Sequence, residues 1–127
     1  MTIVALDTSA LMAPVERDLR LFDELDRLLG AYELVAPAAV RDELSELAAS
    51  AGGAAAKAAS VGGDLVERTD TVETGADTAD AALLELAESE TVDLVATMDA
   101  PLADRILAAG VPVVTERGRQ TLEITHP

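Results

Sequence analysis

The sequence contains no cysteine and no tryptophan, and it has one tyrosine, one phenylalanine and one histidine in 127 residues. The absence of cysteine excludes a disulfide framework, a thiolate nucleophile and sulfur-ligated zinc. The single histidine, His126, lies next to the C-terminus, so neither a Ser-His-Asp triad nor a histidine-rich metal site is expected. Any chemistry must therefore rest on carboxylates, hydroxyls and backbone groups.

Long apolar runs and a basic N-terminal leader are absent as well. No stretch approaches the roughly 20 apolar residues that cross a bilayer, and nothing before Thr2 has the form of a signal peptide. We therefore expect a cytoplasmic protein without membrane contact. A chain of 127 residues is long enough to form one domain whose core needs no disulfides.

Basic residues are scarce in this chain. It has 24 Asp and Glu against 9 Lys and Arg, a formal charge of -15, and Lys57 is its single lysine. Such a charge keeps a protein soluble where salt screens the repulsion, and the composition resembles that of proteins from salt-accumulating microbes, above all haloarchaea. Because half of the residues are hydrophobic, a disordered acidic tail is excluded. The acidic charge therefore indicates a salt-rich solvent rather than a particular binding partner, and it does not exclude nucleic acid as a partner.

Apolar strands alternate with amphipathic helices along the chain. We expect strands at 2–7, 32–36, 65–66, 92–97 and 111–115, a short edge strand at 122–124, and helices at 15–29, 38–49, 54–61, 76–88 and 101–109. This alternation predicts an α/β fold, a doubly wound parallel sheet of about five strands with right-handed crossovers. The glycine pairs at 52–53 and 62–63 predict hinges or turns, and 69–74 is predicted to be a plain polar loop.

Two carboxylates directly follow the most apolar strands. Asp7 ends the first strand and Asp99 follows the fourth. In open α/β sheets, ligands bind at the carboxyl ends of the strands, so both side chains are well placed for chemistry if the two strands are neighbours. For Asp7 a second interpretation stays open, a cap on the following helix, for which Thr8 or Ser9 serves equally well.

Two helices add acids near the same edge. Asp80 falls within the apolar face of helix 76–88, where a carboxylate is costly unless a cation or several donors meet it. A buried arginine partner is the structural alternative. Glu43 borders the apolar face of helix 38–49 and either faces the sheet or is an ordinary solvated residue. Asp77 lies at the edge of the same helix side as Asp80. It either interacts favourably with the dipole of helix 76–88 or contributes to the same metal site as Asp80.

Four converging acids, Asp7, Glu43, Asp80 and Asp99, would repel one another unless a hard cation neutralised them. At least one of them is expected to have a raised pKa without metal, because like charges disfavour full ionisation. Oxygen ligands select Mg²⁺ or Mn²⁺, and such ions promote phosphodiester cleavage. The spacing therefore indicates metal-dependent phosphoryl chemistry and leaves the substrate open.

The chain resembles PIN-domain ribonucleases over nearly all of its length. Four short motifs carry the resemblance, in the same order and at similar intervals: Asp7-Thr8-Ser9, Glu43 in Val40-Arg41-Asp42-Glu43-Leu44, Ala79-Asp80-Ala81, and Thr97-Met98-Asp99. Two closing segments resemble the archaeal branch of VapC9-type toxins and Fcf1 rRNA-processing nucleases: Val111-Pro112-Val113-Val114 and Arg117-Gly118. The resemblance implies a single PIN-like domain over residues 1–127, with three α/β/α layers.

The same resemblance implies Mg²⁺- or Mn²⁺-dependent endonucleolytic cleavage of single-stranded RNA, by attack of hydroxide on a phosphodiester. Asp7, Asp80 and Asp99 would hold the metal, Glu43 would be a further ligand directly or through water, and Asp77 is an additional candidate. The biological role would be that of a toxin in a toxin–antitoxin pair or of an rRNA- or tRNA-processing nuclease.

Further residues and partners follow from the resemblance. Ser9, which stands where many members have Asn, and Thr97 would orient the carboxylates by hydrogen bonds. Arg117 and Arg119 would bind substrate. The partners implied are RNA, an antitoxin protein and a second copy of the chain in a homodimer.

Proteins of other classes fit less well. A receiver-type regulatory domain needs an acid pair after the first strand and a lysine after the fifth, whereas Asp7 has no acidic neighbour and Thr115-Glu116-Arg117 offers no lysine. A haloacid-dehalogenase phosphatase needs Asp-x-Asp where this chain has Asp7-Thr8-Ser9. A PIN fold kept as a catalytically weak scaffold or binding module stays open.

Overall fold

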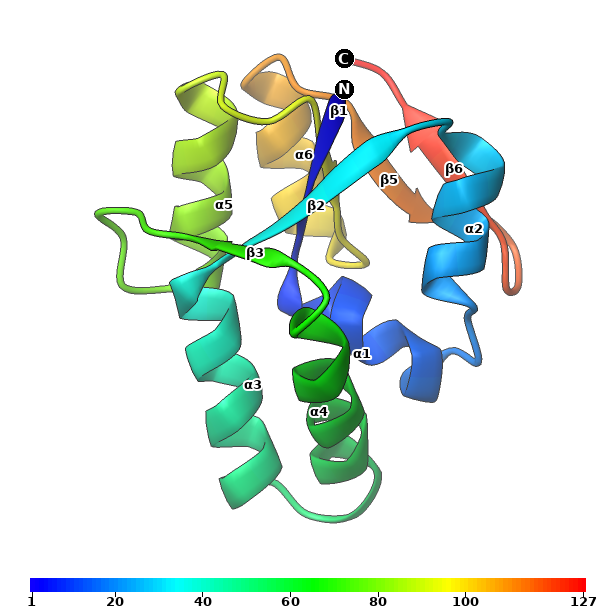
Figure 1. Cartoon of the computed structure of the whole chain (residues 1–127), viewed down its shortest axis with the longest axis vertical. Coiled ribbons are helices and arrows are strands. Elements are labelled where there is room, and N and C mark those ends of the chain that lie inside the picture. Colours follow the sequence, from blue (N-terminus) through cyan, green and yellow to red (C-terminus); the bar gives the residue numbers. More distant parts are fainter.

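The computed structural model describes residues 1–127 and contains one six-stranded sheet with strand order β3-β2-β1-β4-β5-β6 (Figure 1). The strands are β1 (Thr2–Leu6), β2 (Tyr32–Pro37), β3 (Asp70–Val72), β4 (Leu94–Ala96), β5 (Val113–Glu116) and β6 (Leu122–Thr125). Neighbouring strands are parallel except at the edge, where β6 pairs antiparallel with β5.

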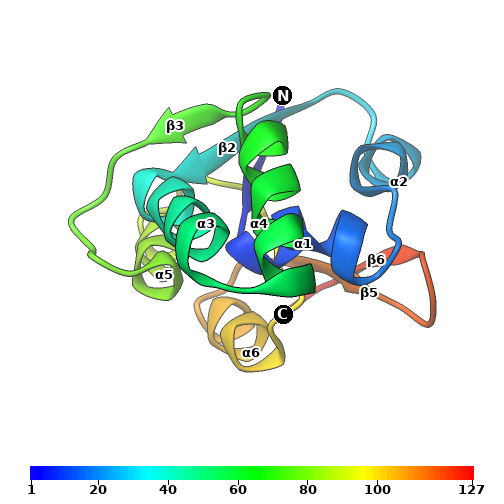
Figure 2. The same cartoon turned by 90° about the horizontal axis from the view of Figure 1, so that it is seen from below.

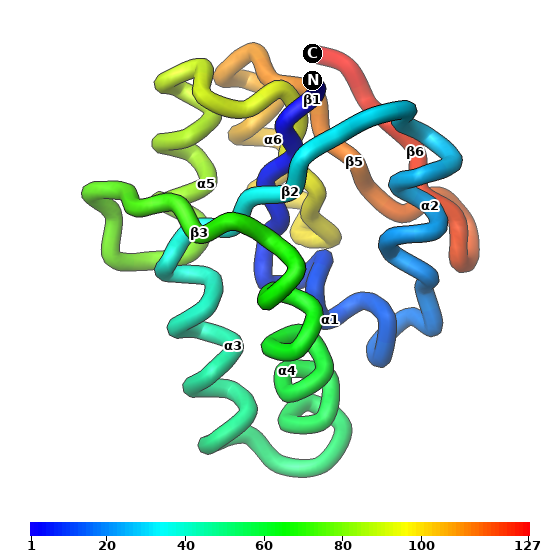
Figure 3. Tube along the Cα trace, in the orientation of Figure 1, coloured from blue at the N-terminus to red at the C-terminus, as the bar shows by residue number.

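Helices flank both faces of this sheet. They are α1 (Thr8–Glu16), α2 (Leu21–Leu28), α3 (Ala38–Ser50), α4 (Gly53–Val66), α5 (Ala79–Glu88) and α6 (Ala100–Ala108). Figure 2 shows α5 and α6 on one side of the sheet and α1, α2 and α4 on the other, and the Cα trace of Figure 3 shows α3 and α4 extending together beyond it. The predicted α/β/α layering around a mostly parallel sheet is confirmed. None of the six helices has the length and apolar character of a transmembrane span.

The single helix predicted over 15–29 is wrong, because the chain forms two helices there. Helix α1 begins at Thr8, and α2 begins at Leu21 after a break at Asp18, which has a left-handed backbone with φ of 50°. The first helix escaped prediction because residues 10–13 are all buried, so it has no polar face to give a helical period.

The third strand was also misplaced. Leu65 and Val66 end α4, and β3 lies at Asp70–Val72, inside the segment predicted as a loop. The strand has only three residues, pairs with β2 at the sheet edge and buries none of its side chains fully. An edge strand of this kind has no apolar run from which it could be recognised.

The glycine pair at 62–63 forms neither a hinge nor a turn, because α4 runs through it. A Cβ on Gly62 would lie 3.0 Å from the carbonyl oxygen of Leu11 in α1 and 3.0 Å from a methyl of Leu44 in α3. A Cβ on Gly63 would meet nothing within 4 Å. Gly62 therefore allows close packing of three helices, whereas Gly63 has no such role.

Gly62→Ala is expected to destabilise the protein by about 1–3 kcal/mol, because the clash includes backbone that cannot rotate away. Gly63→Ala, the matched control one residue later, should stabilise it by up to about 1 kcal/mol, since alanine favours a helix and no contact opposes it. Urea unfolding in high salt measures both. Equal effects of the two substitutions would contradict the close packing at Gly62.

Candidate active site

The candidate site lies at the carboxyl ends of β1 and β4, which are neighbours in the sheet, so the condition for bringing Asp7 and Asp99 to one edge is met. Hydrogen bonds from Asp7 N to Ala96 O (3.0 Å) and from Thr97 N to Val114 O (3.1 Å) continue the ladder beyond the strands. The side chains that follow these strands are therefore held by the central part of the sheet rather than by a free loop.

Asp7 is the most buried of the candidate acids, with 3% of its surface exposed. Two hydroxyl groups, Ser9 Oγ and Thr97 Oγ1, donate hydrogen bonds to Asp7. Both bonds go to the same oxygen, Oδ2, at 2.7 Å each. The other oxygen, Oδ1, receives neither. Asp7 stands at the N-cap position of α1, but its side chain makes no capping hydrogen bond, so the interpretation of its carboxylate as a cap is wrong.

Burial raises the pKa of Asp7 above its ordinary value, and the charge of Glu43 raises it further. Hydrogen bonds from Ser9, Thr97 and the backbone of Thr8 act in the opposite direction but do not cancel the effect of burial. No arginine, lysine or histidine forms an ion pair with this carboxylate. Asp7 is thus a buried anion without a cation.

Ser9 and Thr97 join Asp7 to the segment between β4 and α6. Each hydroxyl donates its proton to Asp7 and also accepts a hydrogen bond from the backbone. Ser9 Oγ accepts from Met98 N (2.8 Å), and Thr97 Oγ1 accepts from Asp99 N (3.0 Å). The two hydroxyl oxygens also lie 3.2 Å apart, but each hydroxyl has one proton and both protons are used. The network therefore fixes the backbone at Asp99 relative to Asp7.

Asp99 is half-buried and caps α6, because its Oδ1 accepts a hydrogen bond from Leu102 N at 3.1 Å. The cap holds the side chain in one orientation at the strand end. It also occupies one of the two carboxylate oxygens, so only Oδ2 is free of this bond.

The prediction that Asp80 is turned towards the core is wrong: 52% of its side chain is exposed, and the guanidinium of Arg105 lies 3.9 Å away. Helix α5 begins at Ala79, and its buried side includes Ala82, so Asp80 falls at the border of the apolar face. Burial raises its pKa most, followed by the charges of Asp7 and Asp99. The expected raised pKa is therefore found at Asp7 and Asp80, with burial rather than repulsion as the first cause.

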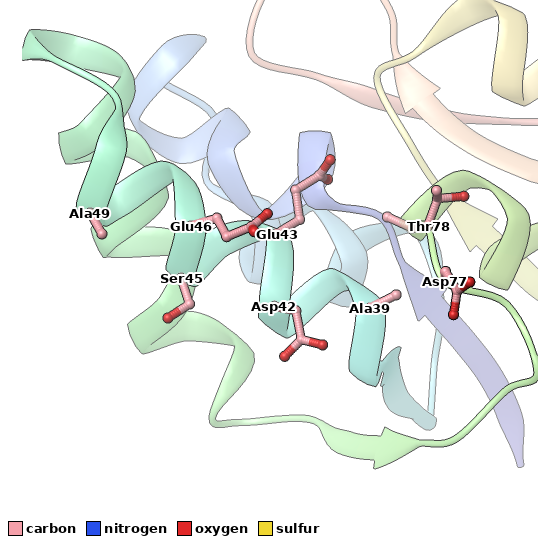
Figure 4. A pocket seen from close by; sticks show the side chains of 9 residues that line it. Ala39, Asp42, Glu43, Ser45, Glu46, Ala49, Asp77 and Thr78 are labelled. Carbon is pink, nitrogen blue, oxygen red and sulfur yellow. The ribbon is translucent and has the colours of Figure 1, made fainter.

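Glu43 and Asp77 lie on either side of an acidic groove. This groove has a volume of about 730 Å³ and runs between α3 and the segment before α5 (Figure 4). Both side chains are exposed, and Asp42 and Glu46 line the groove as well. Asp77 precedes the N-cap residue of α5, Thr78, so its predicted place in the first turn of that helix is wrong.

The two arginines predicted to bind substrate lie in the loop between β5 and β6. Both are exposed, and Arg117 forms only a long ion pair with Glu123 at 3.7 Å. Sequence reasoning missed Arg17, which donates to Glu116 at 2.9 Å across 99 positions of the chain. Its place on the polar side of a predicted helix gave no sign of this contact.

No three acidic side chains form a compact group able to hold a metal ion in the present arrangement. The residues nevertheless fit a hard divalent cation by their chemistry. The nearby donors are carboxylate and hydroxyl oxygens, and Asp7 is buried without a counter-charge. Beside it, Thr8 Oγ1 is buried and has no hydrogen-bond partner.

Comparisons with known proteins identify the family and support the fold. A family model described as "PIN like domain" matches residues 4–119. The chain is similar to the solved structure of the PIN domain endonuclease Utp24, with a TM-score of 0.78 and 23% identity, covering 98% of this chain and 92% of that one. It is also similar to a domain of a functionally unknown protein from Methanocaldococcus jannaschii DSM 2661, with a TM-score of 0.68 and 18% identity over 100% of both chains. No curated protein sequence matches it.

Proposed function

The chain belongs to the PIN-like domain family, and on that premise we propose that it is a divalent-metal-dependent endonuclease that cleaves single-stranded RNA. One observation carries the proposal: Asp7 is a buried carboxylate without a cation, and it lies within electrostatic reach of two acids on helices, Glu43 on α3 and Asp80 on α5. The description of Utp24 as an endonuclease adds support by analogy of fold.

In this proposal, Asp7, Asp80 and Asp99 hold the ion, with Glu43 a further ligand directly or through water. Asp77, across the groove from Glu43, is the remaining candidate. A Mg²⁺ or Mn²⁺ ion bound there supplies the positive charge that activates water and stabilises the charge that develops on the phosphodiester.

The chain's own hydroxyl groups prepare Asp7 for this role. Ser9 and Thr97 direct both of their protons to Oδ2, which holds the carboxylate in place and leaves Oδ1 without a side-chain donor. Because the same hydroxyls accept hydrogen bonds from the backbone N–H groups of residues 98 and 99, they hold Asp7 and the backbone of Asp99 in a fixed relative position. Arg117 and Arg119 lie in an exposed loop from which they contact RNA phosphates.

The finer role is part of the same proposal. The single PIN-like domain over 1–127 acts either as a toxin, with an antitoxin protein as partner and a homodimer as its assembly, or as an rRNA- or tRNA-processing nuclease of the VapC9/Fcf1-like archaeal branch. A neighbouring reading frame that encodes a small DNA-binding antitoxin would favour the toxin, and its absence the processing enzyme. The acidic composition fits a salt-rich cytoplasm.

A PIN fold that serves as a binding scaffold is the second candidate. The observation in its favour is that no three acids form a compact metal-binding group. The two candidates differ in a direct assay of cleavage.

The wild-type protein is expected to cut an end-labelled single-stranded RNA in the presence of Mn²⁺ or Mg²⁺ and to leave it intact in EDTA, because in the proposed reaction the divalent ion activates the attacking water. The assay belongs in high salt, which screens the repulsion in a chain of charge -15. The same strand in a duplex is the control and should be cut more slowly. If the single-stranded RNA stays equally intact with and without metal, the function as a binding scaffold would be favoured.

A further inference from the structure

A second groove runs from the candidate site between α6 and β5. It has a volume of about 340 Å³, at the lower end of the 300–1,000 Å³ or so that is usual for small-molecule sites. One wall is a stripe of α6, Ala100, Ala103 and Leu107, and the facing wall is β5, with Val113 and Thr115. Half of the lining residues are hydrophobic, and Asp104 and Thr125 add polar groups to the rim. The apolar side chains on the two facing walls offer a flat, aromatic group a better fit than a bulky one.

The groove contains a donor and an acceptor of fixed position. Arg17 and Glu116 line it and pair with each other at 2.9 Å, and the side chain of Glu116 is only 14% exposed. A second hydrogen bond, from Gln120 Nε2 to Asp18 at 2.8 Å, ties the same two segments together. Asp18 and Gln120 both have positive φ, 50° and 62°. Such backbone conformations are costly for residues other than glycine and persist where the surrounding structure holds them.

The groove opens beside the residues of the candidate site. Met98 and Ala100, which line it, are the chain neighbours of Asp99, and Met98 N donates to Ser9 Oγ. The groove on the other side of the site is lined by four acids and by no basic residue, whereas the groove beside α6 has two acids, Asp104 and Glu116, and one arginine, Arg17. A phosphate backbone is therefore repelled less on the α6 side. An RNA strand whose phosphate reaches Asp99 is therefore directed towards α6 and Arg17.

We propose that the groove between α6 and β5 is a nucleobase subsite, which takes the unstacked base next to the scissile phosphate of a single-stranded RNA. This inference rests on the proposed function. The apolar walls enclose the faces of the base, and the guanidinium of Arg17 stacks on it or meets the adjoining phosphate. The carboxylate of Glu116 accepts hydrogen bonds from an amino group on the edge of the base. Guanine, adenine and cytosine carry such a group and uracil does not.

Ala100→Phe tests the subsite, because it fills the mouth of the groove from an exposed position at the start of α6. The matched control is Ala108→Phe, which adds the same ring at an exposed position on α6 that does not line the groove. On a mixed-sequence single-stranded RNA with Mn²⁺, wild type and Ala108→Phe should prefer amino-bearing bases over uracil about tenfold at one position beside the cut. Ala100→Phe should lose that preference, and Glu116→Gln should change it.

A binding measurement separates failure of the subsite from failure of the nuclease. Methyl signals of Ala103 and Leu107 in metal-free wild-type protein should shift on addition of a short single-stranded RNA, and they should not shift in Ala100→Phe. If the methyl signals shift with RNA but no RNA is cleaved with Mn²⁺, the proposed subsite is supported and the proposed nuclease activity is overturned. Cleavage whose base preference is unchanged by Ala100→Phe, or methyls that do not shift with RNA, would overturn the subsite and leave the nuclease standing on its own assay.

Discussion

Replacing Asp7 with asparagine is expected to reduce RNA cleavage by more than about 100-fold while making the metal-free protein more stable at neutral pH. Loss of groups that only orient a ligand already costs about 10–100-fold in affinity or activity, so loss of the central carboxylate should cost more. Stability should change in the other direction, because the substitution removes a buried charge that has no cation and relieves its repulsion with Glu43 and Asp80.

The gain in stability has a defined pH dependence. The pKa of Asp7 in the folded protein lies above the ordinary value of 3.8, so between these two values the folded state binds more protons than the unfolded state. The contribution of Asp7 to the stability of wild type therefore falls as pH rises through this window, and the loss is complete above the folded pKa of Asp7. Asparagine does not titrate, so the advantage of Asp7→Asn should be largest at neutral pH and disappear below pH 3.8.

Urea unfolding of both proteins in high salt, between acidic and neutral pH, measures this difference. A structural role alone for Asp7 would give the opposite sign, since breaking the hydrogen bonds with Ser9 and Thr97 would destabilise the variant at all pH values. A variant that is less stable than wild type at neutral pH would therefore contradict the description of Asp7 as a buried anion without a cation.

Millimolar Mn²⁺ is expected to raise the melting temperature of the wild-type protein by about 10 °C. A ligand at a hundredfold excess over its dissociation constant stabilises the folded state by about 2.7 kcal/mol, and each kcal/mol raises the melting temperature of a domain of this size by about 4 °C. The stabilisation is large because the ion supplies the counter-charge that Asp7 lacks and that Asp80 receives only from Arg105, 3.9 Å away.

Ionic strength must be held constant with KCl, since general screening also stabilises so acidic a chain. Asp99→Asn should lose most of the shift. Asp64→Asn, which removes one exposed acid on α4, should keep it. An equal shift in all three proteins would mean that Mn²⁺ acts on the overall charge and not on a site.

The sequence was most informative where burial is complete. The β1 and β4 strands lie at the centre of the sheet, so their apolar runs are continuous, and the acids that follow them, Asp7 and Asp99, were placed correctly at one edge. The hydroxyls of Ser9 and Thr97 were predicted as partners of the carboxylates, and they do donate to Asp7.

Prediction failed where a side chain lies at a border or where its partner is far away in the chain. Asp80 borders the apolar side of α5, and an error of three residues in the start of that helix was enough to misjudge its burial. Its contact with Arg105 and the pair between Arg17 and Glu116 depend on how separate elements pack. No local pattern in the sequence encodes such contacts, and the groove beside α6 was missed for the same reason.

The position of a bound ion tests the central claim most directly. Crystals grown with Mn²⁺ and measured at a wavelength with strong anomalous scattering from manganese would locate it without reference to activity. We predict a peak about 2.0–2.3 Å from Asp7 Oδ1, with Asp99 or Asp80 as a second ligand and Glu43 within reach of a bridging water. A peak confined to the groove between Glu43 and Asp77, or no peak near Asp7 at saturating Mn²⁺, would contradict the account.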